Sequence, residues 1–239
     1  MTDKTVAVIQ ARMGSTRFPG KMIAPFHGEP ILGWVLQRLK RCQRLDQIVL
    51  ATSALDRDQV LLDIADSHGV QTFTGDEQNV LSRFVGATAQ TSADIVVRVC
   101  ADNPLIAPEA VDQLIDFYQQ HRPDYAYNHI PKGSCTHPDG FGAEILSAAL
   151  LRKVSDATTR AEHVEHVTSY IWDHVDEYDI RCPTCPPTWQ MHDNSSRFDV
   201  DHPDDLERLE RMLPGIRFES SVEDILKMWQ KNLTHEGEL

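Results

Sequence analysis

The sequence predicts an α/β fold in which helices cover both faces of a mostly parallel central sheet. Over residues 1 to about 125, short apolar runs rich in β-branched residues alternate with stretches whose apolar residues recur every three or four positions. The apolar runs are continuous, which is typical of parallel strands that are buried on both faces. Because each expected strand is followed by an expected helix, the strands are expected to pair in parallel.

Four strands are expected in this part of the chain, at residues 5–10, 48–52, 70–73 and 94–100. The first helix begins after Pro30, a residue suited to the first turn of a helix. The second ends at Gly69, a residue suited to the left-handed position that follows a helix. The four helical stripes consist of Leu32, Val35, Leu36 and Leu39; Val60, Leu61, Ile64 and Ala65; Val80, Phe84 and Ala87; and Val111, Leu114, Ile115 and Tyr118.

The regular pattern loosens between residues 126 and 196, where prolines are frequent and one helix is expected around residues 162–175. We interpret this segment as an insertion that covers the sheet, within a single domain that comprises residues 1–239. Order returns with a short strand at residues 198–200. Two further helices are expected after it, the second with a serine cap.

The composition and charge of the chain exclude several classes of protein. Apolar residues make up 41% of the 239 residues and charged residues 25%, which is typical of a folded globular chain. No apolar run approaches the roughly 18 residues that a membrane-spanning helix needs, and the N-terminal segment has no signal-peptide pattern, so we expect a cytoplasmic protein. The net charge of −13 argues against a nucleic-acid or anionic-membrane partner. The odd number of cysteines, five, argues against a disulfide framework.

A loop rich in glycine and basic residues follows the first strand, in the segment QARMGSTRFPGK at residues 10–21. Glycines allow close backbone approach, exposed N–H groups bind phosphate, and cations neutralise it, so the loop is a candidate polyphosphate site. It is not a Walker A motif, because five residues separate Gly14 from Gly20 and Met22 replaces the hydroxyl residue that binds magnesium. The alternative interpretation is an exposed basic turn.

Two acidic segments also follow expected strands. Asp102 leaves the fourth strand before Pro104, where a carboxylate could hold Mg²⁺ beside a phosphate loop. The alternative is that Asp102 caps the following turn. In a strand, Asp199 and Asp201 would face the same side, an arrangement that is costly without a cation, although a solvated strand end is also possible.

Six segments resemble a known family in their order along the chain: IQARMGSTRFPGK (9–21), IVLATS (48–53), GDEQNVLSRF (75–84), RVCADNPLI (98–106), EHVTSYIW (165–172) and FDVDHPDDLE (198–207). The family is that of the cytidylyltransferases that activate acidic sugars. The resemblance is closest to the spore-coat-polysaccharide type, which is related to the acylneuraminate and 3-deoxy-manno-octulosonate cytidylyltransferases.

The resemblance implies a Rossmann-like nucleotide-diphospho-sugar transferase fold that binds CTP at the carboxyl ends of its strands. It implies transfer of CMP to an acidic sugar of the nonulosonic or octulosonic type, with release of pyrophosphate, for a surface polysaccharide. It also implies Mg²⁺ as the cofactor and a homodimer in which the segment 126–196 contributes to the acceptor site and the dimer contact. The implied residues are Gln10, Ala11, Arg12, Met13, Gly14, Ser15, Arg17, Lys21, Thr52, Arg83 and Asp102 for the nucleotide, with Arg12, Lys21 and Asp102 catalytic; Asp102, Asp199 and Asp201 for the metal; and Glu144, Glu165 and His166 for the acceptor.

The sequence departs from the family pattern at Gly142, where an acidic residue is usual. This departure supports one alternative, a nucleotide-binding homologue that has lost catalysis. Another alternative is a nucleotidyltransferase that uses a different base or a phosphorylated polyol as the acceptor.

A pair of cysteines, Cys182 and Cys185, has a spacing found in zinc and redox sites. His174 or His192 could complete a metal site there. Because a zinc ribbon needs a second cysteine pair and the other cysteines are isolated in the sequence, a plain loop is the favoured interpretation.

Overall fold

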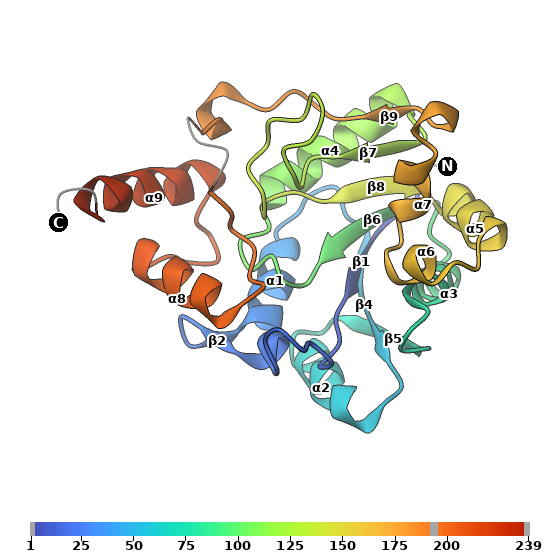
Figure 1. Cartoon of the computed structure of the whole chain (residues 1–239), viewed down its shortest axis with the longest axis horizontal. Coiled ribbons are helices and arrows are strands. Elements are labelled where there is room, and N and C mark those ends of the chain that lie inside the picture. Colours follow the sequence, from blue (N-terminus) through green and yellow to red (C-terminus); the bar gives the residue numbers. More distant parts are fainter. Residues whose placement is uncertain (1–2, 192–195, 237–239) are drawn as a thin grey trace.

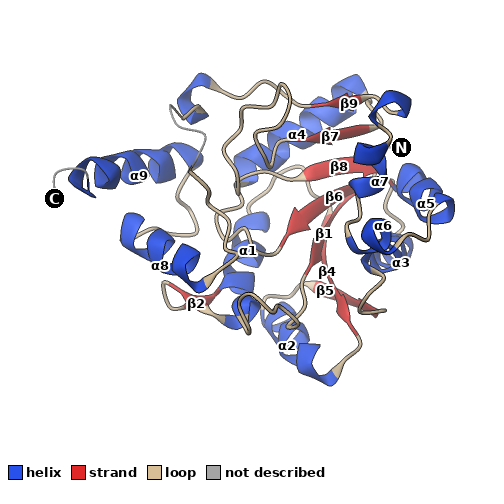
Figure 2. Ribbon diagram, viewed as in Figure 1, coloured by secondary structure: helices blue, strands red, loops and turns tan. Residues whose placement is uncertain are grey.

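The computed structural model describes residues 3–191 and 196–236 and contains a mixed seven-stranded sheet. Helices lie on both sides of it (Figures 1 and 2). The strands are β1 Thr5–Gln10, β2 Pro25–Phe26, β3 Glu29–Pro30, β4 Gln47–Ser53, β5 Gln71–Gly75, β6 Ile95–Cys100, β7 Tyr125–Tyr127, β8 Glu144–Ser147 and β9 Ile180–Arg181. The helices are α1 Ile31–Leu39, α2 Gln59–Ser67, α3 Val80–Thr91, α4 Pro108–His121, α5 Ala148–Ala157, α6 Ala161–Glu165, α7 Ser169–Asp173, α8 Pro203–Met212 and α9 Val222–Glu236.

The strand order in the sheet is β5-β4-β1-β6-β8-β7-β9, and β2 and β3 form a separate small hairpin. All neighbouring strands pair in parallel except β8, which is antiparallel to both β6 and β7. The carboxyl ends of β1, β4 and β6 therefore meet at one edge of the sheet, where ligands bind in open α/β folds.

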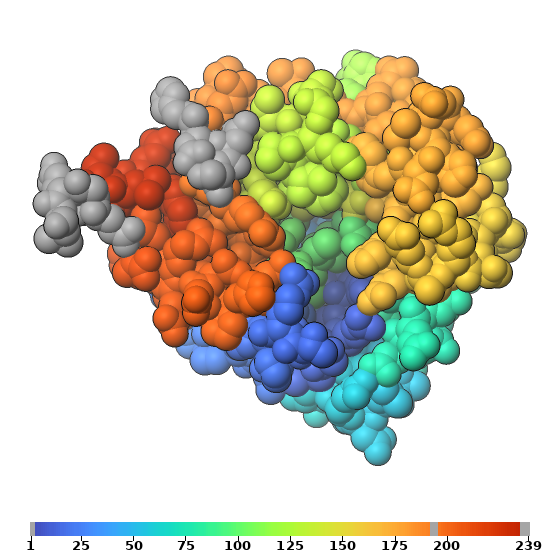
Figure 3. Space-filling model, in the orientation of Figure 1, coloured from blue at the N-terminus to red at the C-terminus, as the bar shows by residue number. Residues whose placement is uncertain are grey.

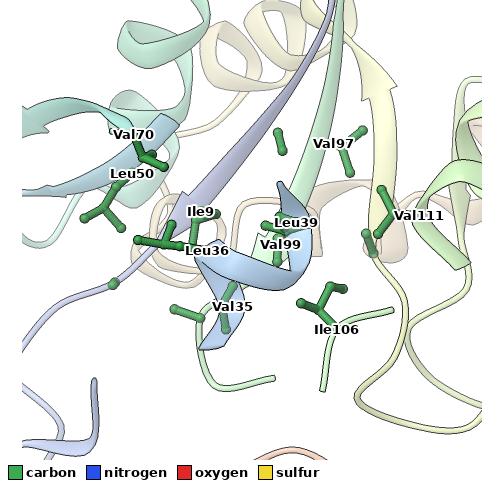
Figure 4. Packing of buried hydrophobic residues seen from close by; sticks show 14 of the residues in the cluster. Ile9, Val35, Leu36, Leu39, Leu50, Val70, Val97, Val99, Ile106 and Val111 are labelled. Carbon is green, nitrogen blue, oxygen red and sulfur yellow. The ribbon is translucent and has the colours of Figure 1, made fainter. Parts of the chain in front are cut away.

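Each face of the sheet has its own apolar core. On one face, Ile9, Val97 and Val99 pack against α1, α2 and α4 (Figure 4). On the other face, Val8 and Val96 pack against α3, α5 and α7. Alternate residues of β1 and β6 thus point to opposite sides, as expected for strands that are covered by helices on both faces.

A third apolar cluster joins the C-terminal helices α8 and α9 to the body of the domain. Phe198 and Val200 are fully buried in it, together with Phe26 and Trp34, and Trp229 of α9 packs edge-to-face on Phe198. This packing fixes the segment that carries Asp199 and Asp201 against the domain.

The expected α/β fold is confirmed. β1 has the expected bounds, β4, β5 and β6 agree within two residues, and α1 to α4 lie over the four predicted stripes. The segment 126–196 also contributes β8, β9 and most of β7 to the same sheet. In the described part of the chain, no helix is long and apolar enough to cross a membrane.

Two predicted elements are wrong. The single helix expected at residues 162–175 is two short helices, α6 and α7, because Val167 and Thr168 between them turn into the core. The strand expected at 198–200 is an irregular segment, and the isolated bridge beside it is made by the preceding residue, Arg197, with Asp139. Its burial still alternates, since Phe198 and Val200 face the core while Asp199 stays partly exposed.

Candidate functional site

A cavity of about 300 Å³ opens at the carboxyl edge of the sheet, directly after β1 and β6. Figure 3 shows this recess near the centre of the view, between the blue N-terminal loop and the yellow segment around α6. It is lined by Gln10, Ala11, Arg12, Gly14, Ser15, Thr16, Arg17, Lys21, Met22, Arg98, Cys100, Ala101, Asp102, Glu165 and His166. The structure thus brings together most of the residues that the sequence predicts for the nucleotide, and two of those predicted for the acceptor.

Hydrogen bonds from neighbouring elements hold the loop after β1 in place. The buried carboxylate of Asp58 accepts from the backbone N–H of Met13 (2.7 Å) and from the hydroxyl of Ser53. Inside the loop, the hydroxyl of Ser15 accepts from the N–H of Phe18 (3.2 Å). Asp58 was not predicted from the sequence, although it follows the end of β4 much as Asp102 follows the end of β6.

Each basic residue of the loop is paired with an acid from a distant segment. Lys21 is buried, and its Nζ lies 3.1 Å from the carboxylate of Asp102 and 3.6 Å from that of Asp201. Arg17 also pairs with Asp201, at 3.1 Å, and Arg12 pairs with Glu165 of α6, at 2.8 Å. The loop cations therefore connect β6, α6 and the 198–201 segment around the cavity.

The segment 198–201 reaches this edge through backbone contacts. The N–H of Val200 donates to the carbonyl oxygen of Asp102 (2.9 Å), and that of Phe198 donates to the carbonyl oxygen of Asp139 (3.2 Å). Gly140 permits the second approach, because it has a φ of +97° and a Cβ there would lie 2.7 Å from the backbone of Phe198. Close backbone approach of this kind requires glycine.

Asp139 is an acidic residue of this region that was not predicted as a site residue. Burial raises its pKa to about 6, and the nearby carboxylates of Asp199, Asp102 and Asp201 add to the rise against the opposing effect of Arg197. Four carboxylates therefore interact electrostatically here. The close approach that Gly140 allows and an ion pair with Arg197 (3.6 Å) hold Asp139 beside them, and the sequence pattern alone gives no sign of either contact.

The three acids predicted to hold a metal are not equivalent. Asp102 and Asp201 converge on Lys21, whereas the carboxylate of Asp199 is engaged by the guanidinium of Arg197, which also lies 3.5 Å from that of Asp201. Among residues 3–191 and 196–236, no group of three or more His, Cys, Asp or Glu side chains is arranged to hold a metal ion. A metal at this site would therefore need oxygen ligands from a substrate in addition to Asp102 and Asp201.

Of the predicted acceptor residues, Glu165 and His166 line the cavity but Glu144 does not. Glu144 is 2% exposed and forms an ion pair with Arg98 of β6. The same carboxylate accepts from the hydroxyls of Tyr125 (2.5 Å) and Thr168 (2.7 Å). Glu144 thus joins β6, β7, β8 and the turn between α6 and α7 from beneath the cavity.

Two residues predicted to contact the nucleotide are buried outside the cavity wall. Thr52 and Arg83 are both 0% exposed. Arg83 donates to the backbone oxygens of Asp76 and Glu77 (2.7 and 2.9 Å), and burial lowers its pKa, with the charge of Arg12 adding to the effect. Their predicted roles toward the nucleotide stay predictions.

Steric packing explains why residue 142 is glycine. A Cβ there would lie 2.2 Å from the backbone oxygen of Asn128 and 2.3 Å from its side-chain oxygen. Asn128 is itself buried and links β7 to α4 and to the start of β8, by hydrogen bonds to Ala110 and Ala143. The packing therefore leaves no space for the acidic side chain that the family pattern places here.

The cysteines at 182 and 185 lie near a third one. Cys182 packs in the same apolar cluster as Cys135, and Cys185 is buried beside Pro186. The metal interpretation finds no support in the described residues, which contain no suitable group of ligands. His174 instead bonds to the carbonyl oxygen of Tyr170 (2.7 Å), and His192 lies outside the described residues.

Comparison with known proteins agrees with this geometry. A family model described as cytidylyltransferase matches residues 6–238. The spore coat polysaccharide biosynthesis protein SpsF of Bacillus subtilis is 29% identical over 94% of this chain and 93% of its own length. A 3-deoxy-manno-octulosonate cytidylyltransferase of Pelobacter propionicus is 38% identical over 46% of this chain and 42% of its own length.

Solved structures give the same answer at the level of the fold. A cytidylyltransferase of Leptospira borgpetersenii superposes with a TM-score of 0.87, at 28% identity, and the match covers 98% of this chain and 96% of that one. A CMP:2-keto-3-deoxy-manno-octonic acid synthetase solved with CTP has a TM-score of 0.62 at 18% identity, over 86% and 96% of the two chains. With the family model matching nearly its whole length, this chain belongs to the cytidylyltransferase family of nucleotidyltransferases.

Proposed function

We propose that this protein transfers CMP from CTP to an acidic sugar of the nonulosonic or octulosonic type and releases pyrophosphate, for the synthesis of a surface polysaccharide. The observation that carries the proposal is the convergence of Asp102 and Asp201 on the buried Lys21, at the mouth of a cavity whose rim is the glycine-rich loop. The lysine that would bind a triphosphate therefore lies close (3.1 and 3.6 Å) to the two carboxylates that would bind the cation of that triphosphate.

The loop residues would act by binding and orienting the nucleotide. Arg12, Arg17 and Lys21 are the cations that a triphosphate would contact, and Gly14 allows its close approach to the backbone. In return, the phosphates would displace Glu165 from Arg12 and the two aspartates from Lys21. Catalysis of this kind rests on positioning and on charge neutralisation, because the protein forms no covalent bond to the phosphoryl group.

Mg²⁺ fits the carboxylates that this exchange would free. Asp102 and Asp201 supply two hard oxygen ligands, and magnesium in nucleotide sites is bound by one or two carboxylates together with phosphate oxygens and water. The bound ion would neutralise charge on the α-phosphate during displacement of pyrophosphate. Asp199, which Arg197 holds aside, would support this pair through its charge rather than as a ligand.

The experiment that tests the proposal measures pyrophosphate release with Mg²⁺ from CTP, ATP, GTP and UTP. Each nucleotide is offered a panel of nonulosonic and octulosonic acids and of phosphorylated polyols. Release with CTP and an acid sugar is the expected result. Release only with another base or only with a polyol phosphate would refute the proposal, and so would stabilisation by CTP without release from any acceptor.

The metal assignment has its own test. Asp102→Asn and Asp201→Asn should each lower turnover by about 100-fold or more while the Tm stays close to that of the wild type, because the lost charge stabilises the transition state. Glu207→Gln, on the exposed side of α8, is a matched carboxylate control that should leave turnover unchanged. Normal activity of the Asp102 or Asp201 variant would remove that residue from the metal site.

Assembly and location complete the proposal. We place the protein in the cytoplasm. We further propose a homodimer whose contact runs through residues 160–175, a range that ends at Val175, which is 48% exposed. Light scattering after size-exclusion chromatography tests the dimer. A monomer at assay concentration would refute that part of the proposal.

A further inference from the structure

The floor of the cavity contains an arginine that the nucleotide does not require. Arg98 lies on β6 opposite Val8 of β1, on the sheet face away from α1 and α4. Because alternate strand residues share a face, Cys100 lies on the same side and is paired with Gln10. All three side chains, Arg98, Cys100 and Gln10, line the cavity, and so does His166 from beyond α6.

Arg98 is held by a group of buried residues that lie behind it. Its Nη1 forms an ion pair with Glu144, whose carboxylate also accepts hydrogen bonds from the hydroxyls of Tyr125 and Thr168. The side chain of Glu144 is 3% exposed and that of Arg98 16%. Glu144 is thus enclosed, whereas part of Arg98 reaches the cavity. The network orients the guanidinium and leaves Glu144 no path to a ligand.

The donor capacity of Arg98 exceeds what the protein uses. A guanidinium carries five N–H donors; in the described part of the chain Nε is buried without an acceptor, and Nη1 pairs with Glu144, so the exposed 16% of the side chain belongs to the rest of Arg98. The charge also acts on its neighbours: burial, with a smaller contribution from the charge of Arg98, lowers the pKa of His129 to about 3. Since two hydroxyls share the charge of Glu144, the guanidinium keeps a positive field toward the cavity.

The position of Arg98 suits a small acid. Its guanidinium approaches the thiol of Cys100, two residues before Asp102. Cys100 ends β6 and Asp102 follows in the next turn, so Arg98 and the predicted reaction centre at Asp102 line the same cavity from one end of the strand. The planar fork of arginine matches the carboxylate of a sugar acid in two parallel hydrogen bonds.

We propose that Arg98 binds the carboxylate of the acceptor acid and makes the enzyme select acids over neutral sugars, with Glu144 as the positioning residue that orients it. The inference rests on the proposed function, because it names the group that distinguishes the acceptor at the same site. It differs from the sequence expectation, in which Glu144 itself contacts the acceptor.

The test compares each acid with its neutral counterpart. N-acetylneuraminic acid and 3-deoxy-manno-octulosonic acid are assayed beside their methyl esters, with CTP saturating and pyrophosphate release as the readout. For the wild type, the accepted acid should have a kcat/KM about 10 to 100 times that of its ester, the range expected for a charge-assisted bidentate contact.

Three variants separate recognition from structure. Arg98→Lys keeps the charge but loses the fork, and should raise the KM for the acid about tenfold. The double variant Arg98→Gln with Glu144→Gln removes both buried charges together, so it avoids leaving one unpaired. It should fold, bind CTP with unchanged affinity in calorimetry, and process acid and ester equally. Arg12→Gln is the reciprocal control, which should weaken CTP binding and preserve the preference for the acid over the ester.

The outcomes are distinct. Loss of the acid preference in both Arg98 variants, with CTP affinity retained, supports the inference. If acid and ester lose activity in the same proportion, Arg98 has only a structural role and the inference is wrong, although the proposed function stands. Release from a phosphorylated polyol alone, with no acid accepted, would overturn the inference and the proposed function together.

Discussion

Replacing Gly142 by alanine should destabilise the protein, because the position has no room for a side chain. The added Cβ would lie 2.2 Å from the backbone oxygen of Asn128, well inside van der Waals contact. Asn128 is fully buried and cannot move aside without breaking its hydrogen bonds to Ala110 (2.8 Å) and Ala143 (2.9 Å). The strain therefore falls on the backbone that joins β7 and β8.

The size of the effect follows from these contacts. Overpacking a dense interior costs about 1–3 kcal/mol, and a buried polar group that loses its partner costs about 1–3 kcal/mol more. We expect a loss of about 3 kcal/mol in the free energy of unfolding, in the lower half of the combined range of about 2–6 kcal/mol. For a chain of this size, each kcal/mol corresponds to about 2–4 °C, so the Tm should fall by about 6–12 °C. Gly142→Asp, the residue usual in the family, should cost more because it also buries a charge.

The assay is thermal unfolding of Gly142→Ala beside Gly33→Ala. A Cβ at Gly33 would lie 2.4 Å from Oε1 of Glu29, which is the far end of a flexible side chain. Alanine is favoured over glycine inside a helix by about 1 kcal/mol, so the Tm of Gly33→Ala should stay level or rise. A Gly142→Ala protein with the Tm of the wild type would refute the packing argument, and Gly142 would again support a homologue that has lost catalysis.

Further predictions concern the loop and the buried histidines. Asp58→Ala should weaken CTP binding about tenfold in calorimetry, because Met13 and Ser53 lose their anchor; unchanged affinity would show that the loop needs no such support. Glu165→Gln should tighten CTP binding by up to about fivefold at low salt, since Arg12 is released from an exposed ion pair; weaker binding would contradict that competition. Burial lowers the pKa of His137 to about 4 and that of His129 to about 3, so below pH 6.5 the unfolded state takes up protons that the folded state does not, and stability is lost as the pH falls. Denaturant unfolding should show that, between pH 7.5 and 5.5, the free energy of unfolding falls by about 1 kcal/mol less for His137→Gln than for the wild type. Equal losses of the free energy of unfolding would place the pKa of His137 near its usual value.

Local patterns were sufficient to predict the first half of the fold. β1, β4 and β6 are continuous apolar runs between helical stripes, and each has packing partners of regular spacing. β7 and β9 have only three and two residues, too few for a periodic signal; β7 becomes a strand by pairing with β8 and β9, and β9 by pairing with β7. The helix expected at 162–175 is interrupted because Thr168 donates to Glu144, a contact over 24 residues that no local pattern contains.

The candidate site likewise contains residues that a local motif predicts and residues that only long-range contacts bring to it. Lys21, Asp102 and Asp201 were predictable because each lies in a short motif beside the end of a strand or in a conspicuous acidic run. Asp139 and Arg98 were not assigned to the site, because their roles depend on which segments touch. The position of Asp139 depends on the close approach that Gly140 allows to Phe198. The orientation of Arg98 depends on its ion pair with Glu144 of β8. Asp199, by contrast, has the predicted location but a different partner, Arg197.

The ion pairs around the loop also bear on how the proposed nucleotide would bind. Arg12, Arg17 and Lys21 are each paired with an acid, from among Glu165, Asp102 and Asp201. A triphosphate that took these cations would leave Asp102 without Lys21 and leave Asp201 to Arg197, 3.5 Å away, next to the negative charge of the phosphates. Like charges so close together repel strongly in a partly desolvated site. In the proposed function, nucleotide binding would therefore be an exchange of partners that a cation shared by the two aspartates completes, and these ion pairs would couple the affinity for the nucleotide to that for the metal.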